Sequence, residues 1–131
     1  MKRPRFRFED LEIWQRGRDL AVALHRLAQS LDERKCYRYA EQLRAAGLSV
    51  PNNVAEGSGS QHIREFQQFL NIARRSLFEN ASMLLCFEAM QLWDAGTIDG
   101  LLSDIDQLSR MVTSFSRSLA RGTGHGARSQ E

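Results

Sequence analysis

Apolar residues recur along this chain at spacings of three and four, the pattern of a helix with one buried face. Four stretches follow the pattern, and recognisable helix start and stop residues separate them. We expect helices from about Leu11 to Gln29, from Ser30 to Gly57, from about His62 to Ala95, and from Thr97 to Arg121. Ser30 begins the second because Glu33 completes a capping-box spacing, and Gly96 ends the third. No strand-period stretch and no internal repeat is visible.

The apolar repeat is close to seven residues in all four stretches, which favours shallow, left-handed crossings, and short connections make sequential helices antiparallel. We therefore predict an all-α fold, an antiparallel up-down-up-down four-helix bundle with left-handed packing. A length of 131 residues with 42% apolar content fits one domain with one core. The expected organisation is a basic N-terminal arm (1–9), the bundle (10–120) and a flexible polar tail (121–131).

The third helix has more apolar surface than one bundle core requires. Beside its core stripe runs a second series at helical spacing, which includes Phe69, Ile72, Met83, Met90 and Trp93. Together the stripes span roughly 160° of the helix, against about 100° for an ordinary surface helix. The helix is either buried more deeply than its neighbours or, as we predict, contributes contacts between copies of the chain.

Polar residues also fall at positions that need an explanation. Asn80 occupies a core step of the third helix, where an unpaired amide would cost about 1–3 kcal/mol, so we expect it to have a partner. Pro51 interrupts the second helical pattern and predicts a kink, because it has no N–H and its ring presses on the carbonyl of Gly47. Asn53 and Glu56 are placed to satisfy the freed backbone groups, and we expect both to be buried and hydrogen-bonded, within the subunit or to a neighbouring copy.

Charge adds a second candidate feature. The net charge of +2 does not by itself indicate a nucleic-acid-binding protein, but sixteen of the eighteen basic residues are arginines. The basic arm is either a solubilising segment or a phosphate-binding one. The candidate nucleic-acid contacts are Lys2, Arg3, Arg5 and Arg7 in the arm and Arg110, Arg117 and Arg121 in the fourth helix.

Nothing in the sequence predicts catalysis, a metal site or a cofactor. The three histidines are scattered, and no glutamate has a histidine three positions later, which a di-iron bundle would need. Glu56 and Glu79 fit partners for Arg74 and the kinked backbone better than a catalytic pair. Cys36 and Cys86 are far apart in the sequence and are expected to be buried as small apolar residues.

The first ten residues are charged and contain no apolar run of signal-peptide length, and no run of eighteen apolar residues occurs anywhere. We therefore expect a cytoplasmic protein without membrane contact.

Three motifs resemble those of a known family: Phe8–Trp14 (FEDLEIW), Leu48–Gly57 (LSVPNNVAEG) and Glu65–Glu79 (EFQQFLNIARRSLFE). They are similar to the bacterial four-helix-bundle proteins associated with intervening sequences of large-subunit ribosomal RNA genes. The resemblance implies ring-shaped homopentamers. It also implies kinship with the accessory protein of diversity-generating retroelements, a basic pentameric barrel that binds a reverse transcriptase and nucleic acid.

Two functions follow as hypotheses. The first is a non-enzymatic, homo-oligomeric scaffold, a pentamer by resemblance, that binds a protein partner. The alternative is an accessory protein that binds RNA or DNA weakly and without sequence preference through arginines on an oligomeric ring. Arginines gathered on one rim would favour nucleic acid, because repetition multiplies weak phosphate contacts, whereas dispersed, acid-paired arginines would favour the scaffold.

Overall fold

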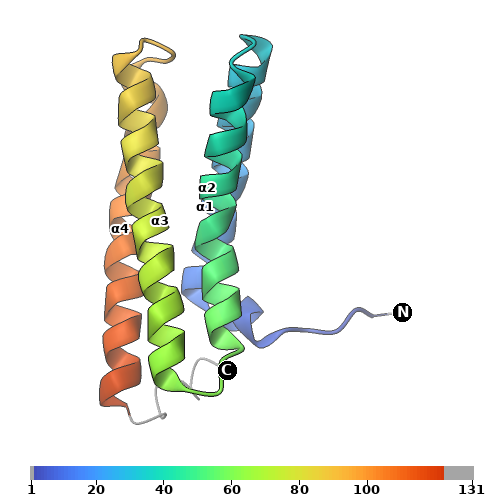
Figure 1. Cartoon of the computed structure of the whole chain (residues 1–131), viewed down its shortest axis with the longest axis vertical. Coiled ribbons are helices and arrows are strands. Elements are labelled where there is room, and N and C mark those ends of the chain that lie inside the picture. The colour runs from blue at the N-terminus through green and yellow to red at the C-terminus, as the bar shows by residue number, and fades with distance from the viewer. Residues whose placement is uncertain (1, 123–131) are drawn as a thin grey trace.

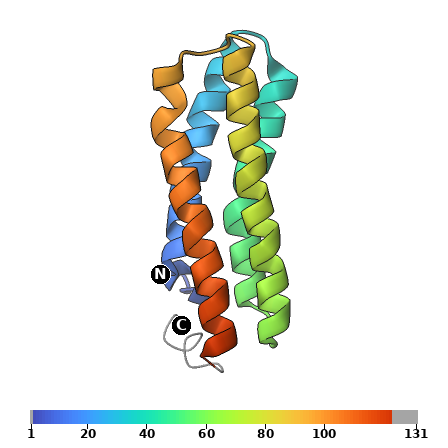
Figure 2. The same cartoon turned by 90° about the vertical axis from the view of Figure 1, so that its left-hand side faces the viewer.

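The structure is a computed structural model that describes residues 2–122. A short 3-10 helix, η1 (Arg7–Asp10), precedes the helices α1 (Glu12–Glu33), α2 (Tyr37–Ser58), α3 (Ile63–Ala89) and α4 (Ala95–Arg121), and this range contains no strand. The helices lie along a common axis, and the chain reverses direction at each connection (Figures 1 and 2). The predicted all-α four-helix bundle is confirmed.

The core consists of the apolar stripes that the spacing predicts. Each helix contributes side chains that are fully or almost fully buried, because residues three and four apart share one face. They include Leu20, Leu24 and Leu31 of α1, Leu43, Val50 and Val54 of α2, Leu70, Leu77 and Leu84 of α3, and Ile98, Ile105, Val112 and Leu119 of α4.

The boundary between the first two helices was predicted wrongly. Ser30 lies inside α1, where its hydroxyl donates a hydrogen bond of 2.6 Å to the carbonyl of Leu27 instead of capping a new helix. The break comes at Lys35, whose φ of 62° is in the left-handed region. A serine three residues before a glutamate therefore does not always cap a helix, because inside a helix the serine can hydrogen-bond to a backbone carbonyl of the preceding turn.

The boundary between the last two helices was also predicted wrongly. α3 ends at Ala89, Gln91 has a φ of 64°, and α4 begins at Ala95, so Gly96 lies inside α4 and is not a stop. The backbone of Thr97 donates to the carbonyl of Asp94, the residue before α4. Trp93 consequently lies in the connection and not on α3.

The four helices do not pack equally. α1 contacts α2 and α2 contacts α3 most extensively, α3 contacts α4 less, and α1 meets α4 least of all. The α1–α2 and α2–α3 contacts are therefore the centre of the packing, α4 is attached mainly through α3, and the side between α1 and α4 is the thinnest. Within residues 2–122, no helix has both the length and the apolar character needed to cross a bilayer.

The first residues leave the bundle as an extended arm, on the side away from α3 and α4 (Figure 1). η1 ties the base of this arm to the α1–α2 pair, because the Phe8 ring packs on Trp14 with 5.0 Å between ring centroids. The flexible tail expected at 121–131 lies outside the described residues from Thr123 onward, and α4 itself continues to Arg121.

Candidate functional site

The second apolar stripe of α3 is only partly exposed. Ile72 and Met90 are 42% and 52% exposed, whereas Phe69 and Met83 are half-buried within the subunit. Met83 packs against the core, and Phe69 lies against α2, where its Cβ would be 2.8 Å from a Cβ placed on Gly57. Phe69 and Met83 are therefore buried within the subunit, the first of the two alternatives for this helix. Of the four side chains, only Ile72 and Met90 present free apolar surface.

Trp93 does not belong to this surface. It lies in the α3–α4 connection, and its ring packs edge-on against Phe87 with centroids 5.6 Å apart. The indole N–H is buried and has no acceptor among residues 2–122. The prediction that Trp93 lies on the stripe is wrong because α3 ends before it, and its side chain closes the end of the core.

α2 passes through Pro51 as one helix, with the proline ring buried against α1. Gly17 of α1 makes this approach possible, since a Cβ there would lie 3.4 Å from the nitrogen of Pro51. Asn53 is half-buried, and its amide donates to the carbonyl and the hydroxyl of Ser49 at 2.7 and 3.1 Å. The asparagine therefore does support the backbone, but at Ser49 and not at the freed carbonyl of Gly47.

The acidic residues of the polar motif do not form a buried network. Glu56 and Glu79 are both exposed, and neither makes a side-chain hydrogen bond or ion pair within the described chain. The expected pairing of both glutamates with Arg74 is therefore wrong within the subunit, where Glu56 is exposed; burial of Glu56 against a neighbouring copy stays a prediction. Arg74 instead places its guanidinium over the Phe78 ring, 4.9 Å from the centroid.

Asn80 is completely buried, as its place in the apolar repeat requires. The expected partner is not there: neither its amide nitrogen nor its oxygen hydrogen-bonds to any residue from 2 to 122. Leu77 and Leu84, which precede and follow it on the buried stripe of α3, are aliphatic and offer no donor or acceptor. A fully buried, unpaired amide is a local cost in stability of about 1–3 kcal/mol.

Four arginines gather on the outer side of α3 and α4. Two adjoining cavities of about 300 and 390 Å³ share Arg74, Thr113 and Arg117, and Arg110 and Arg121 line the second of them. No acidic side chain lines either cavity. We call this surface the arginine groove; its only ion pair among residues 2–122, between Arg110 and Asp106 at 3.1 Å, joins two strongly exposed side chains. The arrangement suits a phosphate group or another anion.

The arm does not join the arginine groove, because it leaves the bundle on the other side (Figure 1). Arg5 is paired with Asp10, with 2.6 Å between Nη2 and Oδ1, and this hydrogen bond raises the pKa of the Arg5 guanidinium. Lys2 and Arg3 are exposed, and Arg7 follows them at the start of η1. The predicted basic residues therefore form two groups: the base of the arm and the last turns of α4 lie at the same end of the bundle, but the extended arm leads away from α4 (Figure 1).

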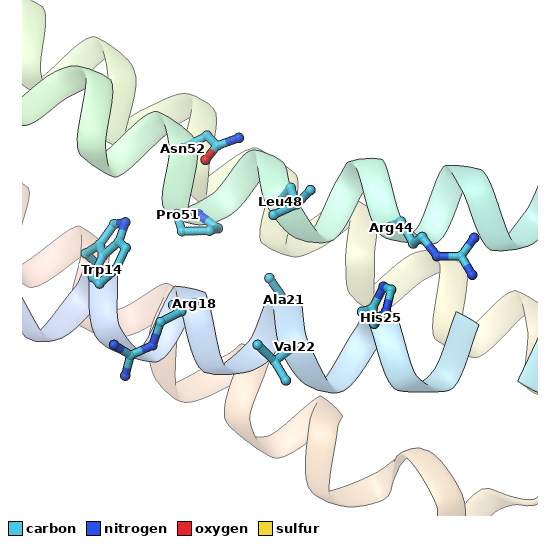
Figure 3. A pocket seen from close by; sticks show the side chains of 9 residues that line it. All are labelled: Trp14, Arg18, Ala21, Val22, His25, Arg44, Leu48, Pro51 and Asn52. Carbon is cyan, nitrogen blue, oxygen red and sulfur yellow. The ribbon is translucent and has the colours of Figure 1, made fainter. Parts of the chain in front are cut away.

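A second groove, which the sequence did not suggest, lies on the outer face of α1 and α2 (Figure 3). It has a volume of about 340 Å³. Its apolar lining is Trp14, Ala21, Val22, Leu48 and Pro51, and Arg18, His25 and Arg44 line its length as well. We call this the α1/α2 groove.

Residues 2–122 contain no group of three or more histidine, cysteine, aspartate or glutamate side chains that could hold a metal ion. Cys36 is half-buried, but Cys86 is exposed on α3, so the expected burial of both cysteines is wrong for Cys86.

Residues 9–114 match the family model of the 23S rRNA-intervening sequence protein. The chain belongs to this family. A comparison with curated proteins found no match. The matched residues run from η1 into α4, so they include both central motifs, the Pro51 segment of α2 and the polar stretch of α3.

Membership of the intervening-sequence protein family confirms the resemblance drawn from the motifs. It does not by itself assign a site, and the kinship with retroelement accessory proteins stays a prediction. The two grooves were missed because each is shared between helices. Periodicity identifies the buried and exposed faces of each helix, but it does not show which exposed faces of two helices lie side by side to form a groove.

Proposed function

We propose that this intervening-sequence protein is a non-enzymatic, cytoplasmic, homo-oligomeric scaffold that binds a protein partner. The supporting observation is the exposed apolar side chains of α3: Ile72 on one flank, and Phe78 and Leu85 on another, are between 42% and 52% exposed, as is Met90 at the C-cap of the helix. Large apolar side chains gathered on one element of a single chain are typical of a contact surface. The resemblance to ring-forming relatives implies five copies.

Light scattering coupled to size-exclusion chromatography tests the proposal on the full chain at micromolar concentration. A pentamer has five times the 15.0 kDa mass of one chain. Any discrete oligomer supports self-association, and the pentameric mass supports the ring. A single species at the mass of one chain overturns the proposal.

The arginine groove favours the second candidate function, the weak binding of RNA or DNA without sequence preference. Arg74, Arg117 and Arg121 converge there, and Ser and Thr hydroxyls line the same cavities. These groups bind phosphate oxygens, and no base-reading module accompanies them. Repetition of the groove in an oligomer would add weak contacts together.

A salt series with labelled RNA and DNA separates the groove from the arm. Two phosphate contacts per subunit would give a slope of about −2 for log affinity against log salt. We expect an Arg117→Gln/Arg121→Gln variant to reduce affinity and slope, and a variant without residues 1–7 to retain both. Loss of binding only on truncation would move the site to the arm, and strongly sequence-selective binding would contradict the electrostatic account.

A further inference from the structure

Phe78 is an exposed aromatic side chain beside the arginine groove. α3 and α4 lie side by side at the front of Figure 2, and the Phe78 side chain of α3 is 52% exposed. The guanidinium group of Arg74 lies over one face of the ring, 4.9 Å from its centroid, and Arg74 also lines both cavities of the groove. A planar aromatic group is therefore in contact with the arginines of this surface.

Three of the four arginines in the groove have no carboxylate partner. Arg117 and Arg121 make no ion pair with any residue from 2 to 122, and the buried Nε of Arg74 has no acceptor there. Because guanidinium groups held close together repel one another, such a groove favours an anionic occupant. Arg110 and Arg121 are about 16 Å apart along the axis of α4, so an occupant with repeated charges fits the groove better than a single small anion.

The surroundings of Phe78 on its own helix are basic or neutral. The residues one turn away on the same side of α3 are Arg74, Arg75, Ala81 and Ser82. Glu79, the next residue in the sequence, lies toward α2, because Ser76 one turn before it hydrogen-bonds to Ser49 of that helix. A group bound over the ring would therefore meet arginines and no carboxylate of this flank.

An aromatic ring among arginines fits a single-stranded nucleic acid better than a duplex or an acidic peptide. The bases of a single strand can splay out and stack on aromatic rings, whereas in a duplex each base is already stacked between its neighbours. Every nucleotide supplies one phosphate and one planar base, so a single strand can occupy the groove and the ring at the same time. An acidic peptide supplies the charges without a regular planar partner for the ring.

We propose that the occupant of the arginine groove is single-stranded RNA or DNA, with phosphates on Arg74, Arg117 and Arg121 and one base stacked on the free face of Phe78. This inference rests on the second candidate function, nucleic-acid binding, and specifies the class of nucleic acid and an aromatic contact. The identity of the base is not read, because every base has a face that can stack on the ring.

Three labelled probes test the class of ligand with the full wild-type chain. They are an oligothymidine of about twelve nucleotides, an abasic strand with the same number of phosphates, and a duplex of the same length. At physiological salt we expect the oligothymidine to bind at least about fivefold more tightly than the abasic strand, because only the first has bases to stack. We also expect it to bind more tightly than the duplex. Equal affinity for the abasic strand, or higher affinity for the duplex, overturns the proposal.

Substitutions at Phe78 separate stacking from charge. Phe78→Leu keeps an apolar side chain but removes the ring, so the affinity for oligothymidine should fall to that for the abasic strand. Its salt dependence should not change, because the phosphate contacts remain. Phe78→Trp restores a stacking surface and should bind at least as tightly as the wild type. Leu85→Ala is the matched control: Leu85 is 49% exposed on the same flank, and its loss should leave the affinity unchanged.

The outcomes distinguish the stacking contact from nucleic-acid binding itself. A wild type that binds none of the probes at low salt overturns nucleic-acid binding. If the probes bind but Phe78→Leu has no effect, or lowers the salt dependence as the arginine variants should, no base stacks on the ring and only the aromatic contact is overturned. Circular dichroism should show unchanged helical content in Phe78→Leu; if it does not, the comparison with the abasic strand still decides, because it uses the wild type. Labelled oligoglutamate that binds as tightly as oligothymidine would assign the groove to an acidic protein partner.

Discussion

At the scale of single residues, the buried amide of Asn80 and the close contact at Gly57 can both be tested by substitution. Asn80 is fully buried without a hydrogen bond to any described residue. Gly57 lies so close to α3 that a Cβ there would be 2.7 Å from Cδ1 of Phe66.

Replacing Asn80 by leucine should stabilise the subunit by about 1 kcal/mol, because an unpaired amide is exchanged for an apolar group with the same branching. Asn53→Leu is the matched control and should destabilise by about 1 kcal/mol, because it removes the bond to Ser49. Urea denaturation measures both. A loss of stability at Asn80 as large as that at Asn53 would mean that the buried amide is hydrogen-bonded in solution.

Gly57→Ala should destabilise by about 1–3 kcal/mol, because the Cβ of Phe69, only 2.8 Å away, cannot rotate aside. Gly100→Ala is the control: a Cβ there meets nothing within 4 Å, and an exposed helical glycine is worth about 0.5–1 kcal/mol less than alanine. The two alanine substitutions should therefore shift the thermal midpoint in opposite directions. Equal shifts would show that α2 and α3 are not in close contact at Gly57.

At the scale of elements, the periodicity predicted the four helices but not where they end. The stripes through Leu24, Leu43 and Leu77 determine which faces are buried, because only a helical period places so many apolar residues on one side. Where a helix ends depends on single residues that can act in two ways. Ser30 can cap a helix or hydrogen-bond within one, and Gly96 can end a helix or lie inside one. The grooves and the unpaired Asn80 could not be predicted, because they depend on neighbours from other helices.

The helix ends themselves provide a test. Gln91 has a φ of 64°, a conformation that glycine adopts without a steric cost. Gln91→Gly should therefore preserve or raise stability, by up to about 1 kcal/mol, whereas Gln68→Gly inside α3 should lower it by about 1 kcal/mol. Chemical denaturation of both variants measures the difference. Equal destabilisation at the two positions would place Gln91 within a helix, as the sequence had suggested.

At the scale of the whole molecule, assembly and stability should be coupled. If the folded chain associates and the unfolded chain does not, mass action raises the thermal midpoint as protein concentration rises. We expect this concentration dependence in the wild-type protein and its loss in Met90→Glu, where a charge replaces a side chain that is 52% exposed. A midpoint that is constant over a hundredfold concentration range in the wild type would contradict the coupling.

The thin contact between α1 and α4 has a consequence for how the chain acquires its structure. Each helix packs chiefly on the one synthesised just before it, and only the α1–α4 contact joins the beginning of the bundle to its end. Most native contacts thus become available as soon as a helical hairpin has left the ribosome, and little loop entropy is spent on distant pairings. The α1–α2 hairpin can form while α3 and α4 are still being translated, and the α1–α4 contact can form only after the whole bundle has been synthesised.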